Sequence, residues 1–289
     1  MVLALEPESV MSATPTASPS PPPEAGADPR TPATPSAGVL VNFQPVHKPE
    51  VHTLSILIPV YNHAEGIGPV IERARKVGLP VWVVDDGSTD GTAASLEHME
   101  GIAVVRHGQN RGKGAALLSG FAALAGKADW AVSIDGDGQH DPNDIPGLIR
   151  AIPAGRRPIV IGRRVGMVGE HVPWTSRFGR GFSNFWVRCA GGPSLTDTQS
   201  GMRIYPLPEA AALGVRARRF QFEVEILVRA QWAGIPVIEA PVGVSYWPGM
   251  KRISHFRPFV DFCRNSETFT RLIFLRIIRL VLGRGAPGK

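Results

Sequence analysis

Two carboxylates stand close together in the middle of the chain, in the segment Asp135-Gly136-Asp137-Gly138-Gln139. This spacing lets both aspartates reach one cation, with Gln139 two residues further on. Oxygen ligands of this kind suit Mg²⁺ or Mn²⁺ shared with substrate phosphates. The alternative is a turn in which each aspartate caps main-chain amides. Because the segment follows a buried strand and lies opposite a second acidic strand end, we predict a metal site at Asp135, Asp137 and Gln139.

Two further strand ends carry polar residues. Asp85-Asp86-Gly87-Ser88 follows the apolar run 81–84, and Pro59-Val60-Tyr61-Asn62 ends the first apolar run. In open α/β sheets, ligands bind at the carboxyl ends of the strands. The three strand ends therefore predict one crevice lined by carboxylates, an aromatic ring and glycines.

Apolar runs alternate with helical patterns between residues 52 and 247. We expect strands at 54–60, 81–86, 102–105, 130–135 and 159–161, and helices that end near 77, start near 92 and span 114–125. This alternation is typical of a parallel, doubly wound sheet covered by helices on both faces. The predicted fold class is therefore α/β, with a mainly parallel central sheet.

A glycine-rich segment, residues 108–114, leads into the last of these helices. It lacks the spacing and the final Ser or Thr of a P-loop, and the first strand-to-helix turn lacks the dinucleotide fingerprint G-x-G-x-x-G. Main-chain amides, the helix dipole and the Lys113 ammonium can still face an anion there. The alternative is a glycine-rich helix start with a solvated Lys113.

Together these elements resemble the family-2 glycosyltransferases, which have the nucleotide-sugar-binding fold called GT-A. Within that family they are most similar to the dolichyl- or polyprenyl-phosphate mannose or glucose synthases. Five segments in order carry the resemblance: 55–62, 83–92, 110–115, 135–142 and 197–203. It covers roughly residues 52–256. The resemblance implies a Rossmann-like GT-A fold and an inverting sugar transfer from a nucleotide-sugar donor.

The resemblance also implies roles for residues at matching positions. The nucleotide would be bound by Pro59, Tyr61, Glu65, Asp85, Asp86 and Lys113, and the metal by Asp135, Asp137 and Gln139. Arg164 and Arg177 match basic positions that approach phosphates, and Asp197 matches an acidic position near the reacting carbon, so these three are the predicted catalytic residues. Alternatively, Pro59 and Tyr61 simply end a strand, and Arg164 and Arg177 are surface charges.

The acceptor site that the resemblance implies contains Arg203, Lys251, Arg252, Ser254 and His255. Two positions depart from the family pattern. His63 and Ala64 precede Glu65, where the family often has Glu directly after the Tyr-Asn pair. His255 stands where the subgroup has lysine, so the charge it would offer a phosphate depends on pH; the alternative is a plain surface histidine.

Proline content and charge divide the chain into three segments. We predict a disordered Pro/Ala-rich segment at 1–50, a glycosyltransferase domain at 51–249 and a basic segment at 250–289. Residues 1–50 hold 11 of the 27 prolines, and residues 250–289 contribute +7 to a total formal charge of +6 over 289 residues. A basic charge confined to one end disfavours nucleic acid as a partner. Two cysteines exclude a disulfide framework, and no apolar run reaches 18 residues, so no transmembrane helix is expected.

The C-terminal segment has an amphipathic pattern. Residues 272–282 include nine apolar residues and two arginines. On a helical wheel Arg264, Arg271 and Arg279 share one sector, while Phe274 and Val281 fall opposite. We expect such a helix to make peripheral contact with an anionic membrane surface. The alternative is packing on the domain or on a second subunit.

We therefore expect a metal-dependent, inverting glycosyltransferase that moves a hexose from a GDP- or UDP-sugar to a polyprenyl phosphate. It would be cytoplasmic and peripherally associated with the membrane. The alternatives are transfer to a hydroxyl of a lipid, polyene or glycan, and a catalytically idle nucleotide-sugar-binding protein. A hydroxyl acceptor needs a general base, with Asp197 as the first candidate, whereas a lipid phosphate is already an anion. Intact Asp135, Asp137 and Asp197 disfavour the idle protein.

Overall fold

The computed structural model describes residues 53–165, 174–243 and 258–282. The predicted disordered segment at 1–50 lies outside these residues, so the division into three segments stays a prediction. Within the described residues, no helix is long and apolar enough to cross a membrane.

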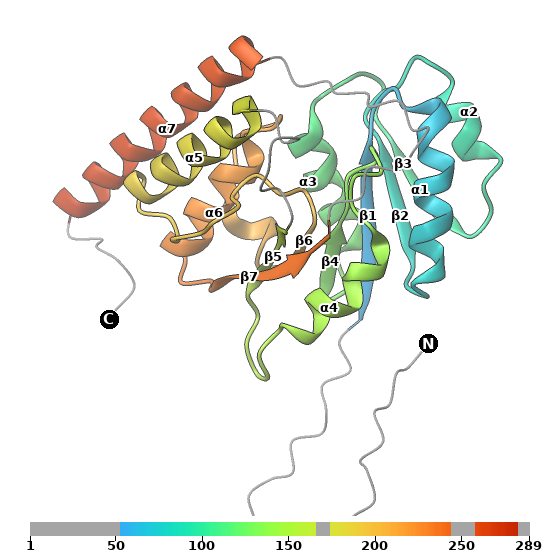
Figure 1. Ribbon diagram of the computed structural model, residues 1–289, viewed down its shortest axis with the longest axis horizontal. Coiled ribbons are helices and arrows are strands. Elements are labelled where there is room, and N and C mark those ends of the chain that lie inside the picture. Colours follow the sequence, from blue (N-terminus) through green and yellow to red (C-terminus); the bar gives the residue numbers. More distant parts are fainter. Residues whose placement is uncertain (1–52, 166–173, 244–257, 283–289) are drawn as a thin grey trace, which may run out of the picture. The chain divides into compact units, whose positions relative to one another are not determined.

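A seven-stranded sheet forms the centre of the described part of the chain (Figure 1). Its strands are β1 (Leu54–Val60), β2 (Val81–Asp85), β3 (Ile102–Arg106), β4 (Trp130–Ser133), β5 (Ile159–Arg164), β6 (Arg203–Pro206) and β7 (Val237–Val242). Their order is β3-β2-β1-β4-β6-β5-β7. The pairings are parallel except those that β6 makes with β4 and β5. The predicted α/β class with a mainly parallel sheet is confirmed.

The five predicted strands form where their apolar runs require burial on both faces. In β1, Ile56 and Ile58 belong to the core on one face of the sheet and Leu57 to the core on the other, and all three are fully buried. A strand covered on both sides must be apolar at consecutive positions. β6 and β7 were not predicted, because β6 has only four residues and begins with the charged Arg203, and β7 contains Glu239 and Pro241.

Helices cover both faces of the sheet. They are α1 (Ala64–Lys76), α2 (Thr92–Glu97), α3 (Lys113–Leu124), α4 (Ile145–Arg150), α5 (Trp174–Cys189), α6 (Phe222–Trp232) and α7 (Pro258–Val281), with short 3₁₀ helices at Pro142–Asp144 and Ala211–Leu213. Apolar residues of α1 and α4 share a core with Ile56, whereas those of α3 and α6 share a core with Leu57. The loops that follow β1, β2 and β4 are thereby held at one edge of the sheet.

The C-terminal helix α7 packs beside α5 and α6 (Figure 1). Phe269 and Leu272 of α7 are buried in a cluster that these three helices form. Two of its arginines also face the domain: Arg271 Nη2 donates to Glu225 Oε2 at 2.6 Å, and Arg276 Nη1 donates to the carbonyl of Cys189 at 2.6 Å. The helix therefore packs on the domain, which was the alternative, and Arg271 does not point outward as the membrane interpretation required.

Candidate functional site

A cavity of about 610 Å³ opens where β1, β2 and β4 end. Its lining includes six of the predicted site residues: Pro59, Tyr61, Asp86, Lys113, Asp135 and Asp137. The start of α3, residues 219–220 before α6, and Asp261 and Arg264 of α7 complete much of the wall. Ligands of open α/β sheets bind at this edge. This cavity is therefore the crevice that was expected from the strand ends.

The other predicted residues lie elsewhere. Glu65 is exposed on the first turn of α1, and Asp85 and Gln139 are not part of the cavity lining. Arg164, Asp197 and Arg203 also lie outside this lining. Five predicted positions fall outside the side chains that the structure describes: Arg177, Lys251, Arg252, Ser254 and His255.

The two aspartates after β2 have different partners. Asp85 is fully buried, accepts a hydrogen bond from the Ser88 amide at 2.9 Å and pairs with Arg106 of β3 at 3.3 Å. A second hollow, of about 330 Å³, lies beside it and is lined by residues 87–89 and 106–108. Asp85 therefore shapes the wall between β2 and β3 through Ser88 and Arg106.

Asp86 organises the turn that leads into α3. Its Oδ1 lies 2.7 Å from Nδ1 of the buried His107 and accepts the Arg111 amide at 2.9 Å, while its Oδ2 accepts the Gly112 amide at 2.6 Å. The φ of Gly112 is 99°, a left-handed conformation that glycine adopts most readily. A Cβ at Gly112 would also overlap the main chain of Arg218. The glycine and Asp86 together bring Lys113 to the cavity.

Lys113 lies between two carboxylates. Its Nζ is 2.6 Å from Asp135 Oδ1, and it also forms an ion pair with Glu223 of α6. Burial disfavours the charged ammonium, but Asp135 and Glu223 outweigh this effect and raise the pKa of Lys113. The alternative interpretation, in which Lys113 is solvated, is therefore wrong, because the Lys113 side chain is only 15% exposed.

The groups around Asp135 favour its ionised form. Burial acts to raise its pKa, but Lys113 and other cationic groups lower it overall. The neighbouring His140 is buried, and this burial lowers the pKa of His140 to about 4, so its imidazole is neutral near pH 7. Lys113 is thus the cation paired with Asp135. The carboxylate rests against Gly201, where a Cβ would overlap it.

Asp137 faces the cavity and is fixed by Gln139. The Gln139 amide donates to Asp137 Oδ1 at 3.1 Å, and its side-chain Nε2 donates to Oδ2 at 2.8 Å. The aspartate therefore also forms the capped turn that was its alternative interpretation. Among the described residues, no group of three or more His, Cys, Asp or Glu side chains is arranged to hold a metal ion.

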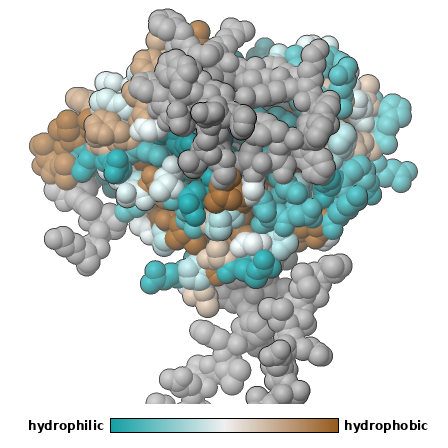
Figure 2. Space-filling model, in the orientation of Figure 1, coloured by the Kyte–Doolittle hydropathy of each residue, from teal (hydrophilic) through white to brown (hydrophobic). Residues whose placement is uncertain are grey.

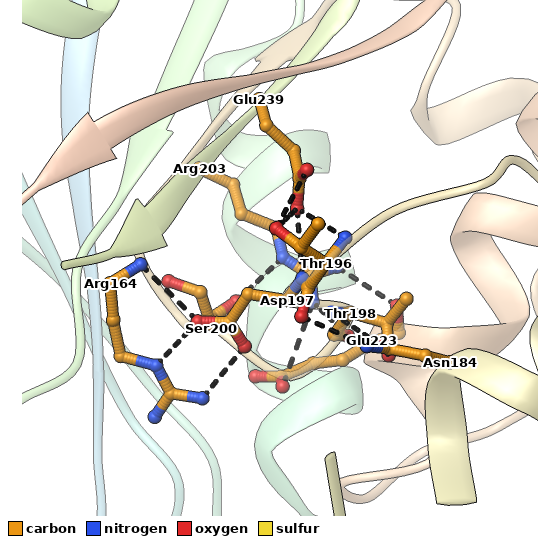
Figure 3. Close-up of polar contacts among 9 residues, drawn as sticks. All are labelled: Arg164, Asn184, Thr196, Asp197, Thr198, Ser200, Arg203, Glu223 and Glu239. Carbon is orange, nitrogen blue, oxygen red and sulfur yellow. Dashed lines mark hydrogen bonds and ion pairs between the residues drawn. The ribbon is translucent and has the colours of Figure 1, made fainter. Parts of the chain in front are cut away.

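Arg164 and Asp197 form a closed pair (Figure 3). Arg164 Nε donates to Asp197 Oδ2 at 2.7 Å, and Nη2 donates to Oδ1 at 2.8 Å. The Asp197 amide is held in turn by Glu239 Oε1 at 2.8 Å. Burial acts to raise the pKa of Asp197, but the Arg164 guanidinium outweighs it and lowers that pKa. Two of the three predicted catalytic residues are therefore neighbours, and both Asp197 oxygens already accept hydrogen bonds.

Arg203, which was predicted to contact the acceptor phosphate, is fully buried. Its guanidinium donates to three main-chain carbonyls, those of Ser200 at 2.7 Å and of Thr198 and Glu223 at 2.9 Å (Figure 3). A side chain with these partners has no access to a substrate. We therefore reassign Arg203 to positioning the 198–201 loop, which carries Gly201 behind Asp135.

Sequence reasoning missed several residues of the site: His107, Arg219, Glu223, Asp261 and Arg264. Glu223 lies in the first turn of α6, where an acidic residue is explained by the helix dipole alone. The two residues that it contacts lie far from it in the chain: Lys113 is 110 positions away and Arg203 is 20 positions away. No local pattern reports such contacts, so only the fold could identify Glu223.

Comparison with known proteins agrees with this geometry. The sequence model of glycosyl transferase family 2 matches residues 55–206. The UDP-N-acetylglucosamine–dolichyl-phosphate N-acetylglucosaminyltransferase of Methanococcus voltae is 29% identical over 213 residues, which cover 66% of this chain and 85% of the relative. The undecaprenyl-phosphate mannosyltransferase of Micrococcus luteus is 31% identical over 199 residues, covering 64% and 81%.

A solved structure also has this fold. The glucosyl-3-phosphoglycerate synthase of Mycobacterium tuberculosis, in complex with Mn²⁺, UDP-glucose and phosphoglyceric acid, superposes with a TM-score of 0.58. It is 21% identical, and the match covers 77% of this chain and 78% of the other. At this identity the likeness establishes the shared fold.

Proposed function

We propose that this chain, which belongs to glycosyl transferase family 2, transfers a hexose from a GDP- or UDP-sugar to a polyprenyl phosphate with inversion, at the cytoplasmic face of a membrane. The observation that carries the proposal is the cavity at the strand ends, where Lys113, Asp135 and Asp137 lie together. The relatives from Methanococcus voltae and Micrococcus luteus, whose names specify dolichyl and undecaprenyl phosphate, support the acceptor class.

The cavity suits a nucleoside diphosphate sugar. Pro59 and Tyr61 supply an apolar and aromatic wall for the nucleoside, and Lys113 and Arg219 supply positive charge for the phosphates. Arg219 makes no ion pair with any described residue and donates to Asn110 Oδ1 at 3.1 Å. Its charge is therefore available to an anionic ligand in the cavity.

The residues present fit a divalent metal shared with the donor. Mg²⁺ in proteins is usually held by one or two carboxylates together with substrate phosphates, rather than by a complete protein cage. Asp135 already pairs with a cation, Lys113, and Asp137 lines the same cavity. Asp135 and Asp137 would therefore hold the metal, and Gln139 would fix the side chain of Asp137. A bound metal would offset the charge that develops on the leaving diphosphate.

The state of Asp197 supports a phosphate acceptor over a hydroxyl. A general base must take up a proton, and its pKa is best placed near the working pH. Asp197 has a lowered pKa and both of its oxygens accept hydrogen bonds from Arg164. A polyprenyl phosphate is already ionised and requires no such base. We therefore assign Arg164 and Asp197 to organising the site beside the reacting carbon.

A row of apolar side chains on the outer face of α7 supports contact with a bilayer. Phe274 is 63% exposed, Ile277 is 53% exposed and Val281 is 79% exposed. Figure 2 shows the resulting hydrophobic patch over the C-terminal half of the helix, at the left of the view. Because Arg271 and Arg276 point toward the domain, we propose that this contact is made by apolar side chains rather than by the basic face expected from the sequence.

We expect Ile277→Asp to weaken binding to phospholipid vesicles about tenfold, because a large apolar side chain contributes about 1.5–3 kcal/mol when it leaves water. Ala94→Asp, at an exposed position of α2 on the side of the sheet away from α7 (Figure 1), is the matched control. Vesicle sedimentation at low and high salt measures the effect. Equal loss in both variants, or binding by the wild type that high salt abolishes, would contradict the apolar contact.

We expect Gly201→Ala to lower kcat/KM about 100-fold. A Cβ at this position would overlap the Asp135 carboxylate and move it from Lys113, and displacements of about 1 Å can reduce rates by that factor. The control is Gly181→Ala, because a Cβ there would meet nothing within 4 Å. Steady-state transfer assays on both variants test this; similar activities would refute the close packing of Asp135 on Gly201.

The proposed function is tested by incubating the protein with each GDP- or UDP-hexose and polyprenyl phosphate in vesicles, with and without Mg²⁺ or Mn²⁺. We expect one donor to yield a lipid-soluble labelled sugar, and a chelator to abolish the reaction. No transfer from any donor would favour an idle nucleotide-sugar-binding protein. Transfer to a glycolipid hydroxyl but not to the phosphate would support the hydroxyl acceptor instead.

A further inference from the structure

The carboxylate of Asp135, which is proposed to hold the metal, is already paired with the ammonium of Lys113. Nζ lies 2.6 Å from Asp135 Oδ1, and the Asp135 carboxylate packs against Gly201 on another side. The side chain of Lys113 is 15% exposed, that of Asp135 25% and that of Glu223 8%. A divalent ion that approaches Asp135 therefore meets a positive charge that is already paired and largely shielded from water.

We propose that Lys113 is the resident counter-ion of Asp135, that it gives way only when a divalent metal arrives together with the donor diphosphate, and that Glu223 is the positioning residue that retains Lys113 during the exchange. This inference rests on the proposed function. It makes the binding of metal and donor interdependent, so that neither binds well alone.

The charges around Lys113 support this exchange. Lys113 and Arg203 balance Asp135 and Glu223, with Arg203 3.7 Å from Glu223 Oε2, and Asp137 in the same cavity leaves the group with one negative charge. A divalent ion alone would reverse this to one uncompensated positive charge, which is costly where side chains are poorly solvated. A nucleotide sugar has two ionised phosphates, so metal and donor together return the group to its starting charge.

The geometry of Glu223 allows Lys113 to move without losing its charge partner. An ammonium has three donors, and Asp135 and Glu223 engage two of them. Glu223 is itself fixed, because it lies in the first turn of α6 and its carbonyl accepts a hydrogen bond from Arg203 Nη1 at 2.9 Å. When Asp135 binds metal, Lys113 can stay on Glu223 and direct its remaining donors to the diphosphate.

Mn²⁺ binding, measured by electron paramagnetic resonance of free Mn²⁺ in the full-length protein without acceptor, tests the inference. For the wild type we expect weak binding of Mn²⁺ alone and binding at least about tenfold tighter with UDP or GDP, because the coupling between two binding sites is typically about 5–150-fold. Lys113→Gln should bind Mn²⁺ alone at least about tenfold more tightly than the wild type and lose most of the nucleotide effect. Lys76→Gln, exposed at the end of α1, should behave as the wild type.

Glu223→Gln gives a second, opposite result that does not depend on the stability of Lys113→Gln. With Glu223 neutral, Lys113 is held by Asp135 alone, so Mn²⁺ should bind more weakly than in the wild type. Thermal melting identifies variants that do not fold. Unchanged Mn²⁺ affinity in either folded variant, or no Mn²⁺ binding in any state, overturns the inference. Transfer to polyprenyl phosphate that persists with a chelator would, in that case, leave the proposed transferase activity standing.

Discussion

Asp137→Asn is expected to lower kcat/KM at least about 100-fold while the protein stays folded, because electrostatic stabilisation of the leaving group is usually worth that much. The substitution removes the charge of a carboxylate that faces the cavity. It retains an oxygen that can accept the Gln139 main-chain amide, which the native Oδ1 does at 3.1 Å, and its amide nitrogen can donate to the Gln139 side chain once that side-chain amide turns its oxygen toward it. Loss of activity would therefore report the missing charge rather than a collapsed turn.

Asp141→Asn is the matched control for this prediction. Asp141 lies four residues further on and accepts the Asn143 amide at 3.0 Å, a bond that asparagine can also accept. It is not part of the cavity lining. Transfer rates and melting temperatures of both variants should be compared. If Asp137→Asn keeps wild-type kcat/KM, or if Asp141→Asn loses as much, then Asp137 does not hold the metal.

Arg203→Ala is expected to have the largest effect on stability, lowering the free energy of unfolding by about 3–5 kcal/mol, the cost of breaking a buried charged network. The guanidinium is fully buried and satisfies the carbonyls of Thr198, Ser200 and Glu223. Alanine would leave these carbonyls unpaired and would remove a positive charge from beside Glu223. The three carbonyls are reached by a planar guanidinium with several donors, whereas lysine has one compact ammonium. Arg203→Lys should therefore recover only part of the lost stability.

Urea unfolding followed by circular dichroism measures this difference, with Arg188→Ala on the exposed surface of α5 as the control. An exposed arginine should change the unfolding free energy by no more than about 0.5 kcal/mol. A normal stability for Arg203→Ala combined with weaker acceptor binding would contradict the positioning role and restore the acceptor-phosphate role that the sequence suggested.

The strands that carry the site could be predicted because burial on both faces of a sheet leaves a continuous apolar run. That signal is strong for β1, where six of seven residues are buried. It is absent for β6, which begins with the charged Arg203, whose guanidinium donates to the carbonyls of Thr198, Ser200 and Glu223. A short antiparallel strand that begins with a buried charge has no local pattern, so the insertion of β6 between β4 and β5 could not be foreseen.

The candidate site was predictable residue by residue but not as a network. Asp135 and Lys113 were each chosen for their place at a strand end or a helix start, and their pairing follows only from the fold. The same holds for Arg164 and Asp197, which lie 33 residues apart. The orientation of α7 could not be predicted either, because a helical wheel gives sectors but does not say which sector a buried Glu225 will attract.

The central claim, that an ionised polyprenyl phosphate is the acceptor, is tested most directly by comparing undecaprenyl phosphate with undecaprenol in the same vesicles and with the same donor. The two lipids share one chain and differ only in phosphate and hydroxyl. Because Asp197 is held ionised by Arg164 and a hydroxyl would need a base worth about 100-fold or more, we predict transfer to the phosphate at least about 100 times faster. Equal rates, or faster transfer to undecaprenol, would contradict the account.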